Sequence, residues 1–231
     1  MDKRLKVLIA LVACAGAALL ALGASRATGE DLKALIVLAV LGVLAERYSV
    51  GLFKSYVSVG AVAVLIAAVV SGVWGVALVA PCAVLAGGLR TQVAWYKRVF
   101  NLGTYFVSGA AFVGIFRAFG YDALAGEWPQ VLAPALIGAL VNFAINSALV
   151  ATAVGLSERR SVAGVWKENY LWLLPQYLVV GLAAMSAATA YEMIGLWGFA
   201  VFAAPVLGIR HAYSVGARKP SPEEVPLPKA A

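Results

Sequence analysis

Amide side chains inside long uncharged stretches are the groups of this chain that could recognise a ligand. Asn142 and Asn146 lie four residues apart in the apolar run 128–157, and therefore share one face of a helix. A polar side chain at bilayer depth is energetically costly, so it usually faces the interior of a helix bundle or a water-filled cavity. Each of these residues is accordingly a candidate for ligand binding.

Two further apolar runs carry polar side chains that join this set. The candidate ligand-binding residues are Asn101, Tyr105, Asn142, Asn146, Gln176 and Tyr177. If successive helices alternate in direction, Asn101, Asn146 and Gln176 all lie in the cytoplasmic half of the membrane, where they could form one polar cluster. The competing interpretation is packing, because Asn, Gln and Ser also form hydrogen bonds between membrane helices, worth only about 0.6–2 kcal/mol each.

No constellation typical of an enzyme occurs in the sequence. There is no carboxylate pair inside an apolar run, no nucleophile elbow, no glycine-rich phosphate loop and no His-Glu-x-x-His motif. His211 is the only histidine and follows Arg210, so we expect an interfacial anchor rather than a metal ligand. Glu192 is expected to be an exposed carboxylate at the end of a helix. We predict no enzymatic activity, no metal and no cofactor.

The composition places these residues in a membrane. Hydrophobic residues make up 63% of the 231 residues, charged residues make up 13%, and the mean hydropathy is +0.90. Globular proteins carry about 25% charged residues, so a soluble domain is excluded. A membrane-spanning helix needs about 20 apolar residues. The uncharged runs that could supply spans are 7–25, 34–45, 55–89, 99–116, 128–157, 169–191 and 193–209.

One run is too long for a single span, and another is short. We expect the run 55–89 to form a helical hairpin, because Ser71-Gly72 in its middle suits a tight turn. Counting that run twice predicts an all-α, polytopic integral membrane protein with about eight transmembrane helices, within a range of six to eight. The run 34–45 either extends back to Leu32 or spans only half of the bilayer.

Basic residues predict the orientation of these helices. With the N-terminus in the cytoplasm, fifteen of the eighteen Lys and Arg residues fall on the cytoplasmic side. Such residues in short loops favour the cytoplasmic face. We therefore predict a multi-pass bacterial protein of the inner (plasma) membrane with both termini cytoplasmic and with loops near Gly72, Ala125 and Gly195 outside. The net charge of +7 predicts attraction to lipid headgroups, whereas nucleic-acid binding is not expected, because the basic residues are separated by membrane.

Two stretches depart from the pattern of spans and loops. Residues 46–58 contain β-branched and aromatic side chains that suit a short extended or hairpin element at the cytoplasmic face. Residues 157–174 have apolar positions at helical spacing among charged ones, which predicts an amphipathic helix in the inner interface; Pro175 predicts the bend into the next span. Residues 1–213 are expected to form one transmembrane domain, and the proline-rich segment 214–231 a disordered cytoplasmic tail.

The two cysteines give no disulfide framework. Leu11-Val12-Ala13-Cys14 resembles the box in which bacterial lipoproteins are acylated. The other interpretation is an ordinary cysteine in an uncleaved first helix, which we favour because apolar sequence continues after Cys14. Cys82 lies within a predicted span.

Residues from about Tyr56 to Tyr213 resemble the multi-helix membrane-associated sensor modules that precede bacterial HD-GYP and other signalling domains, a type similar to vitamin-uptake membrane proteins. The resemblance rests on the region of Asn101, on the Asn142 and Asn146 pair, and on the Trp-Lys-Glu-Asn…Leu-Leu-Pro-Gln-Tyr stretch. It implies a sensor-like module that acts through a separate partner, because no catalytic signalling domain follows in this sequence.

Vitamin-uptake S-components, the substrate-binding membrane subunits of energy-coupling-factor transporters, are similar to these sensors. They dock their partner through an Ala-x-x-x-Ala ridge on the first helix, and Ala13, Ala17 and Ala21 form such a ridge here. This resemblance implies a small hydrophobic or vitamin-like ligand and a protein partner, although eight helices exceed the six typical of S-components. An S-component-like or other small-solute transporter is therefore the alternative function, and a structural or assembly protein is a third.

Overall fold

The computed structural model describes residues 2–25, 29, 31–46, 50–52, 55–57, 60–90, 94–121 and 129–200, most of which are helical. In chain order, the elements are α1 (Lys3–Ala24), α2 (Leu32–Glu46), β1 (Val50–Leu52), β2 (Ser55–Val57), α3 (Gly60–Arg90), α4 (Trp95–Ala118), α5 (Leu132–Glu158), α6 (Val162–Asn169), the 3-10 helix η1 (Leu171–Leu173) and α7 (Leu174–Ile194). The antiparallel pair β1-β2 pairs Val50 with Val57 and confirms the hairpin element predicted in this stretch.

Five helical segments are long and apolar enough to cross a membrane. They are Lys3–Ala24, Gly60–Gly87, Trp95–Ala118, Leu132–Glu158 and Leu171–Ile194. Helix α2 begins at Leu32, as one sequence interpretation expects, but its 15 residues are fewer than the roughly 20 that a full span needs. Of the last predicted span, 193–209, residues 193–194 end α7, residues 195–196 form a turn and residues 197–200 are helical. Residues 201–209 and the tail 214–231 lie outside the described residues.

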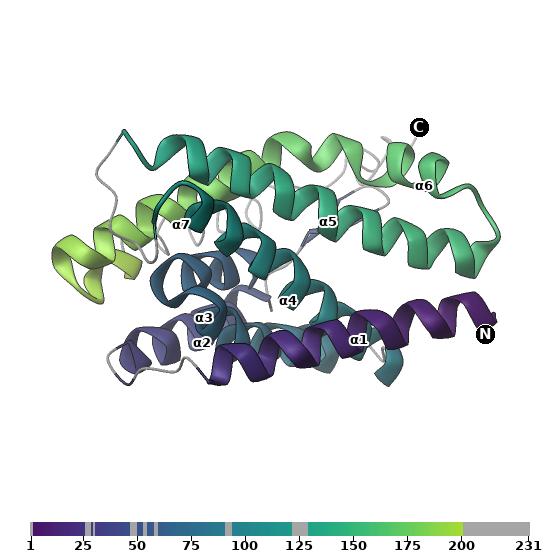
Figure 1. Ribbon diagram of the computed structural model, residues 1–231, viewed down its shortest axis with the longest axis horizontal. Helices are drawn as coiled ribbons and strands as arrows, with labels where there is room; N and C mark the ends of the chain where they lie inside the picture. The colour runs from purple at the N-terminus through teal and green to yellow at the C-terminus, as the bar shows by residue number, and fades with distance from the viewer. Residues whose placement is uncertain are drawn as a thin grey trace, which may run out of the picture.

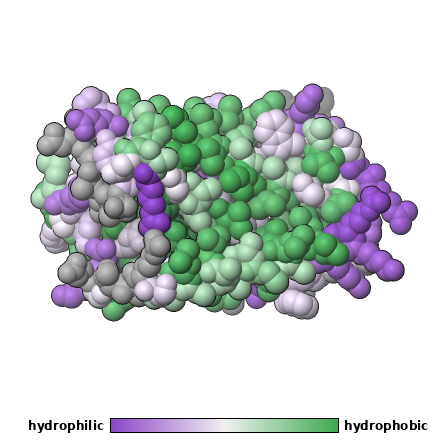
Figure 2. All heavy atoms as spheres, in the orientation of Figure 1, coloured by the Kyte–Doolittle hydropathy of each residue, from purple (hydrophilic) through white to green (hydrophobic). Residues whose placement is uncertain are grey.

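The middle of the bundle surface is apolar. In Figure 1, α1, α4 and α5 run mainly along the long axis of the molecule. Figure 2 shows a hydrophobic band across the centre of this axis, with hydrophilic residues gathered at both ends. Large apolar side chains such as Ile36, Val40 and Leu44 are about half exposed along one stripe of α2. An apolar belt between two polar ends is the surface that a bilayer would cover.

Contacts near helix ends show how the chain alternates between the two ends of the bundle. Asp31, which precedes α2, accepts a 2.7 Å hydrogen bond from the Ser71 hydroxyl in the middle of α3. Gly23 near the end of α1 packs on Val73, and a Nη atom of Arg117 near the end of α4 approaches Gly72. The end that carries these residues is called the opposite face below, and the end where α1 begins is called the N-terminal face.

At the N-terminal face, Glu46 joins α2 to both ends of α3. This residue is 6% exposed, and its carboxylate accepts a 3.2 Å hydrogen bond from the amide of Gly60, the first residue of α3. The other carboxylate oxygen lies 3.0 Å from the position that a Cβ of Gly87 would occupy. A negative charge at a helix N-terminus is favourable, so Glu46 acts as a cap supplied by a neighbouring helix. The sequence analysis did not single out this residue.

Helix α3 folds back on itself, as the Ser71-Gly72 pair predicts. Both residues have non-helical backbone angles, and Gly72 has φ 59° and ψ −142°, a region that is essentially restricted to glycine. Gly75 lies directly against the backbone of Ala67, eight residues earlier. In a continuous helix, residues eight apart are separated by about 12 Å. The two arms of α3 therefore form a helical hairpin with a closely packed turn.

A second turn of the same type follows α7. Gly195 has φ 62° and ψ −146°, and Gly198 lies against the backbone of Ala190, again eight residues earlier. The local sequences correspond: residues 72–77 read Gly-Val-Trp-Gly-Val-Ala and residues 195–200 read Gly-Leu-Trp-Gly-Phe-Ala. The molecule thus contains two copies of a Gly-x-Trp-Gly turn.

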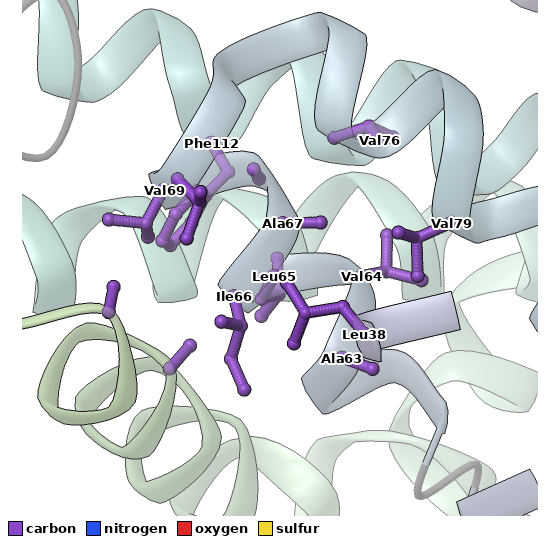
Figure 3. Close-up of a cluster of buried hydrophobic side chains, with 14 of the residues drawn as sticks. Leu38, Ala63, Val64, Leu65, Ile66, Ala67, Val69, Val76, Val79 and Phe112 are labelled. Atoms are coloured by element: carbon purple, nitrogen blue, oxygen red, sulfur yellow. The ribbon is translucent and has the colours of Figure 1, made fainter. Parts of the chain in front are cut away.

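The main core lies around α3. Figure 3 shows side chains from both arms of this helix, among them Val64, Val69 and Val79, gathered with Leu38 of α2 and Phe112 of α4. Leu38, Val79 and Phe112 are fully buried. These contacts hold α4 in place, and α4 in turn supports the helix that carries the two candidate asparagines.

Candidate functional site

Asn142 lies on α5, where small residues bring three helices close together. Gly138, one turn before it, faces Phe112 of α4, and a Cβ on Gly138 would lie 2.9 Å from that ring. On the other side, Gly181 of α7 packs directly against Ala139. Small residues at such positions let membrane helices approach closely. The close approach encloses Asn142, which is 6% exposed, while Asn146 is half-buried.

The Gly138–Phe112 contact also sets the register between α4 and α5, which run in opposite directions. One turn further along each helix, this register brings Ser108 level with Asn142, and two turns further on it brings Thr104 level with Asn146. Ser108 is buried and its hydroxyl donates to the Tyr105 carbonyl over 3.5 Å. By this register, Asn142 and Ser108 lie at the α4–α5 interface, whereas the predicted tyrosine Tyr105 is half-buried and packs against the main core.

Asn142 makes no side-chain hydrogen bond to any residue that the structure describes. The Asn142 amide is nevertheless not among the completely enclosed unpaired side-chain atoms of the described residues, which include Trp74 Nε1 and Thr189 Oγ1. It belongs to a largely buried residue and keeps its donor and acceptor open to a group outside the described residues.

A second group of side chains joins α5 to α6 and α7. The Trp166 indole donates a 2.8 Å hydrogen bond to the Ser147 hydroxyl, which donates in turn to the Phe143 carbonyl over 2.6 Å. The Phe143 ring lies 5.0 Å from the Tyr177 ring and 6.1 Å from the Trp166 ring, measured between centroids. Phe143 and Trp166 were absent from the predicted site. The spacing of four between Phe143 and Ser147, next to that of Asn142 and Asn146, could have indicated a second face of α5.

Helix α6 confirms the predicted helix after α5 but is shorter and faces inward. Ser161 caps its N-terminus by accepting from the Gly164 amide, and Val165 is fully buried. The apolar side of α6 packs on α5 through Trp166, so protein covers at least part of the face that the sequence analysis assigned to the membrane interface. The chain then enters α7 at Leu174, with Pro175 in its first turn, as predicted.

Charged groups of this region stay at the surface. Arg160 bonds Glu168 at 2.6 Å and Glu158 at 3.5 Å, and all three side chains are about half exposed. Such exposed pairs contribute little to stability. Burial, and to a lesser extent the charge of Glu158, raises the pKa of the Tyr170 hydroxyl above its usual value of about 10, so this group stays neutral at physiological pH.

The other predicted residues divide between these groups and the surface. Asn101 is exposed near the start of α4, so it does not share the buried setting of Asn142. Gln176 is half-buried on α7, next to Tyr177. Glu192 is exposed, as expected, and His211 lies outside the described residues. The structure thus supports two adjoining groups of side chains, on either side of α5, in place of one cluster centred on Asn101, Asn146 and Gln176.

The predicted alanine ridge lies mostly outside the helix packing. Ala17 and Ala21 are exposed and Ala13 is half-buried, whereas Gly16 faces α4, where a Cβ would lie 2.8 Å from the Gly103 Cα. Helix α1 therefore packs through Gly16 and leaves the alanines on its outer side.

Comparison of the chain with protein-family models, with curated proteins and with solved structures finds no match. The functional argument therefore rests on the chain's own residues.

Proposed function

We propose that the chain is a membrane-embedded ligand-binding module of the sensor type, which acts through a separate partner protein. The observation that carries this proposal is Asn142, a 6% exposed residue inside an apolar helix, whose amide is not completely enclosed and bonds to no described side chain. A ligand that bonds this amide would offset its desolvation and would couple binding to the packing of α4, α5 and α7. The partner would read the altered packing, since the chain carries no enzymatic motif of its own.

The test replaces Asn142 by Leu, which has a similar volume and cannot form hydrogen bonds. Solutes that copurify with the protein from a mild detergent would be identified by mass spectrometry, and the thermal midpoint would be recorded. We expect the bound solute to be lost, and the midpoint of the ligand-free protein to be unchanged or raised. Ala144→Leu, on the exposed side of the same helix, is the matched control and should retain the solute. An unchanged set of copurifying solutes in Asn142→Leu would contradict the proposal and favour packing.

A small-solute transporter subunit, similar to an S-component, is the second candidate. The exposed Ala17 and Ala21 of α1 favour it, because small residues four apart on an outer helix face let a partner helix approach closely. Ala17→Trp tests docking. The exposed ridge has room for a large side chain in the isolated protein, and a tryptophan would clash only with a partner that covers the ridge. Copurification with tagged energy-coupling subunits should fail for Ala17→Trp and succeed for the wild type. A wild type that never captures such subunits would eliminate this candidate.

We further propose that the chain spans the inner membrane about eight times, within the predicted range of six to eight, with both termini in the cytoplasm. Among the described residues, nine basic residues lie at or near helix ends of the N-terminal face and two, Lys33 and Arg117, at the opposite face. This asymmetry would place the N-terminal face in the cytoplasm. A cysteine introduced at Pro222, in a chain without Cys14 and Cys82, should resist an impermeant thiol reagent in intact cells. Labelling there would contradict the topology.

A further inference from the structure

The helices extend to different depths when they are measured from the turn of α3. Gly23 of α1 and Arg117 of α4 both lie beside this turn, at the opposite face. From there α1 runs twenty residues to Lys3 and α4 runs nineteen residues to Arg98, which is about 28–30 Å at 1.5 Å per residue. The hydrocarbon core of a bilayer is about 30 Å thick. Lys3 and Arg98 therefore mark its boundary at the N-terminal face.

Helix α2 and the first arm of α3 end below this boundary. Glu46, the last residue of α2, is fifteen residues or about 22 Å from Asp31, which bonds the turn. The second arm gives the same depth, because Gly87, beside the Glu46 carboxylate, is fifteen residues from Gly72. In Figure 1, α2 lies toward the end opposite the N-terminus, whereas α1 continues to the N-terminus. The tip formed by Glu46 and Gly60 thus lies about 6–8 Å inside the membrane.

The cap of α3 suits a helix that begins inside a membrane. The first amides of a helix have no partner within it, and the bilayer core offers no water to bond them. Glu46 is 6% exposed and bonds the Gly60 amide at 3.2 Å. The caps of α1 and α6 are Asp2 and Ser161, and both are exposed. Among these three helices, only α3 has its cap supplied by a buried side chain of another helix.

The second half of the chain has the same order of motifs on longer helices. Glu-Arg-x-Ser-Val follows α2 at residues 46–50 and occurs again at residues 158–162, at the end of α5, and a Gly-x-Trp-Gly turn comes later in both halves. Helix α5 has 27 residues where α2 has 15, and α7 has 21 residues before its turn where the first arm of α3 has twelve. Glu158 is exposed, whereas Glu46 is buried. The longer pair is long enough to cross a bilayer, and the shorter pair is not.

We infer that α2 and the first arm of α3 form a re-entrant pair, which enters and leaves the membrane by the opposite face and has its tip inside the bilayer. This pair leaves six of the eight predicted spans as full crossings and keeps both termini on one side. Glu46 is then an intramembrane carboxylate that bonds the polar end of a half-length helix. The inference rests on the proposed membrane topology and is independent of any ligand.

Spin labels at three exposed positions test the depth of the tip. The full-length protein without Cys14 and Cys82 would carry Leu44→Cys beside the tip, Val99→Cys near the start of α4, or Leu32→Cys at the start of α2. In lipid nanodiscs, relaxation by oxygen and by a water-soluble nickel chelate gives the depth of each label. We expect the label at Leu44 to lie about 7 Å deeper than that at Val99, and the label at Leu32 to lie at the opposite interface. A difference of less than about 3 Å between Leu44 and Val99 would overturn the re-entrant pair.

Lysine substitutions measure the same depth without a label. A lysine at hydrocarbon depth is costly, so Leu44→Lys should lower the yield of folded protein at least about fivefold. Val99→Lys is the matched control, because this position lies next to Arg98 at the boundary, and it should keep the wild-type yield. Equal yields for the two variants would contradict the depth of the tip.

The two outer labels separate the failure of this inference from the failure of the proposed topology. If the labels at Leu32 and Val99 both lay deep in the hydrocarbon, the topology would be wrong, and the re-entrant pair with it. If they lay at the two interfaces and Leu44 lay level with Val99, only the re-entrant pair would be wrong.

Discussion

The two Gly-x-Trp-Gly turns have the same backbone geometry and contrasting surroundings. At the first turn, Val73 and Val76 are buried and the N–H of the half-buried Trp74 is enclosed by protein without a partner. At the second turn, Trp197 is 77% exposed and Met193 is 79% exposed. The first turn contacts α1, α4 and Asp31 before α2. At the second turn, Phe199 is 1% exposed, stacks on Tyr191 with 4.9 Å between the ring centroids, and belongs to the main core, while the tryptophan points away from it.

This contrast separates the backbone reversal, which the local sequence produces, from the burial of the tryptophan, which depends on neighbouring helices. Two glycines three residues apart suffice to reverse a helix tightly, because the first adopts a backbone conformation closed to other residues and the second lets the arms touch. Burial of the tryptophan between them depends on which helices pack alongside. Substitutions at matched positions of the two turns can therefore measure the two contributions separately.

The largest effect is expected for Gly75→Val. A Cβ at this position would overlap the backbone of Ala67, so the two arms of α3 could not pack without moving apart. We expect a loss of more than about 3 kcal/mol of stability, or no recovery of monodisperse protein from detergent. Gly114→Val is the matched control, because no atom lies within 4 Å of the Cβ position on Gly114. A wild-type melting curve for Gly75→Val would show that the close approach of the arms is not needed.

Tryptophan replacement distinguishes the two turns most directly. Trp74→Ala should cost about 2–3 kcal/mol, because it leaves a cavity beside the core, whereas Trp197→Ala should cost less than about 0.5 kcal/mol. Thermal unfolding in detergent would compare the two variants. Trp74→Phe should be milder than Trp74→Ala, since the indole N–H has no hydrogen bond to lose. Equal costs at the two positions would mean that the second turn is as well covered as the first.

Replacement of the turn glycines should affect both turns alike. Gly72→Ala and Gly195→Ala each force a side chain into a left-handed conformation, with φ near 60° at both positions. We expect each to lower the stability by about 1–2 kcal/mol, as judged from thermal midpoints against the wild type. A cost at Gly72 alone would show that the conformation matters only where the turn is buried.

The smallest effect is expected at the residue before each turn glycine. Ser71→Ala removes the hydrogen bond to Asp31 and should cost about 1 kcal/mol. The second turn has Ile194 in the equivalent position, and Ile194→Ser should bring no gain, because this residue is about half exposed. A stabilisation of the second turn by Ile194→Ser in thermal melts would reveal an acceptor there comparable to Asp31.

Much of the candidate site could not be predicted from the sequence, because the burial of a residue depends on which helices pack beside it. Asn101 and Asn142 look alike in the sequence, since each is an amide inside an uncharged run, yet the first is exposed and the second is buried. Membrane helices are apolar on all sides, so no periodic stripe indicates which face turns inward. The same limit hid the interface of α1, which uses Gly16 and not the neighbouring Ala17.

The sequence by itself determined the local features of this protein. Ser71-Gly72 set the reversal in α3, Pro175 set the start of α7, and the lack of charges in long runs set the apolar belt, because each acts through backbone sterics or through composition. Only the tertiary structure decided that the Glu46 carboxylate caps α3, that Trp166 reaches Ser147, and that Asn142 is buried while Asn101 is exposed. These outcomes depend on which small residues let two helices that are distant in the sequence approach each other. Such an approach needs matching residues on both helices, so the sequence of one helix does not reveal it.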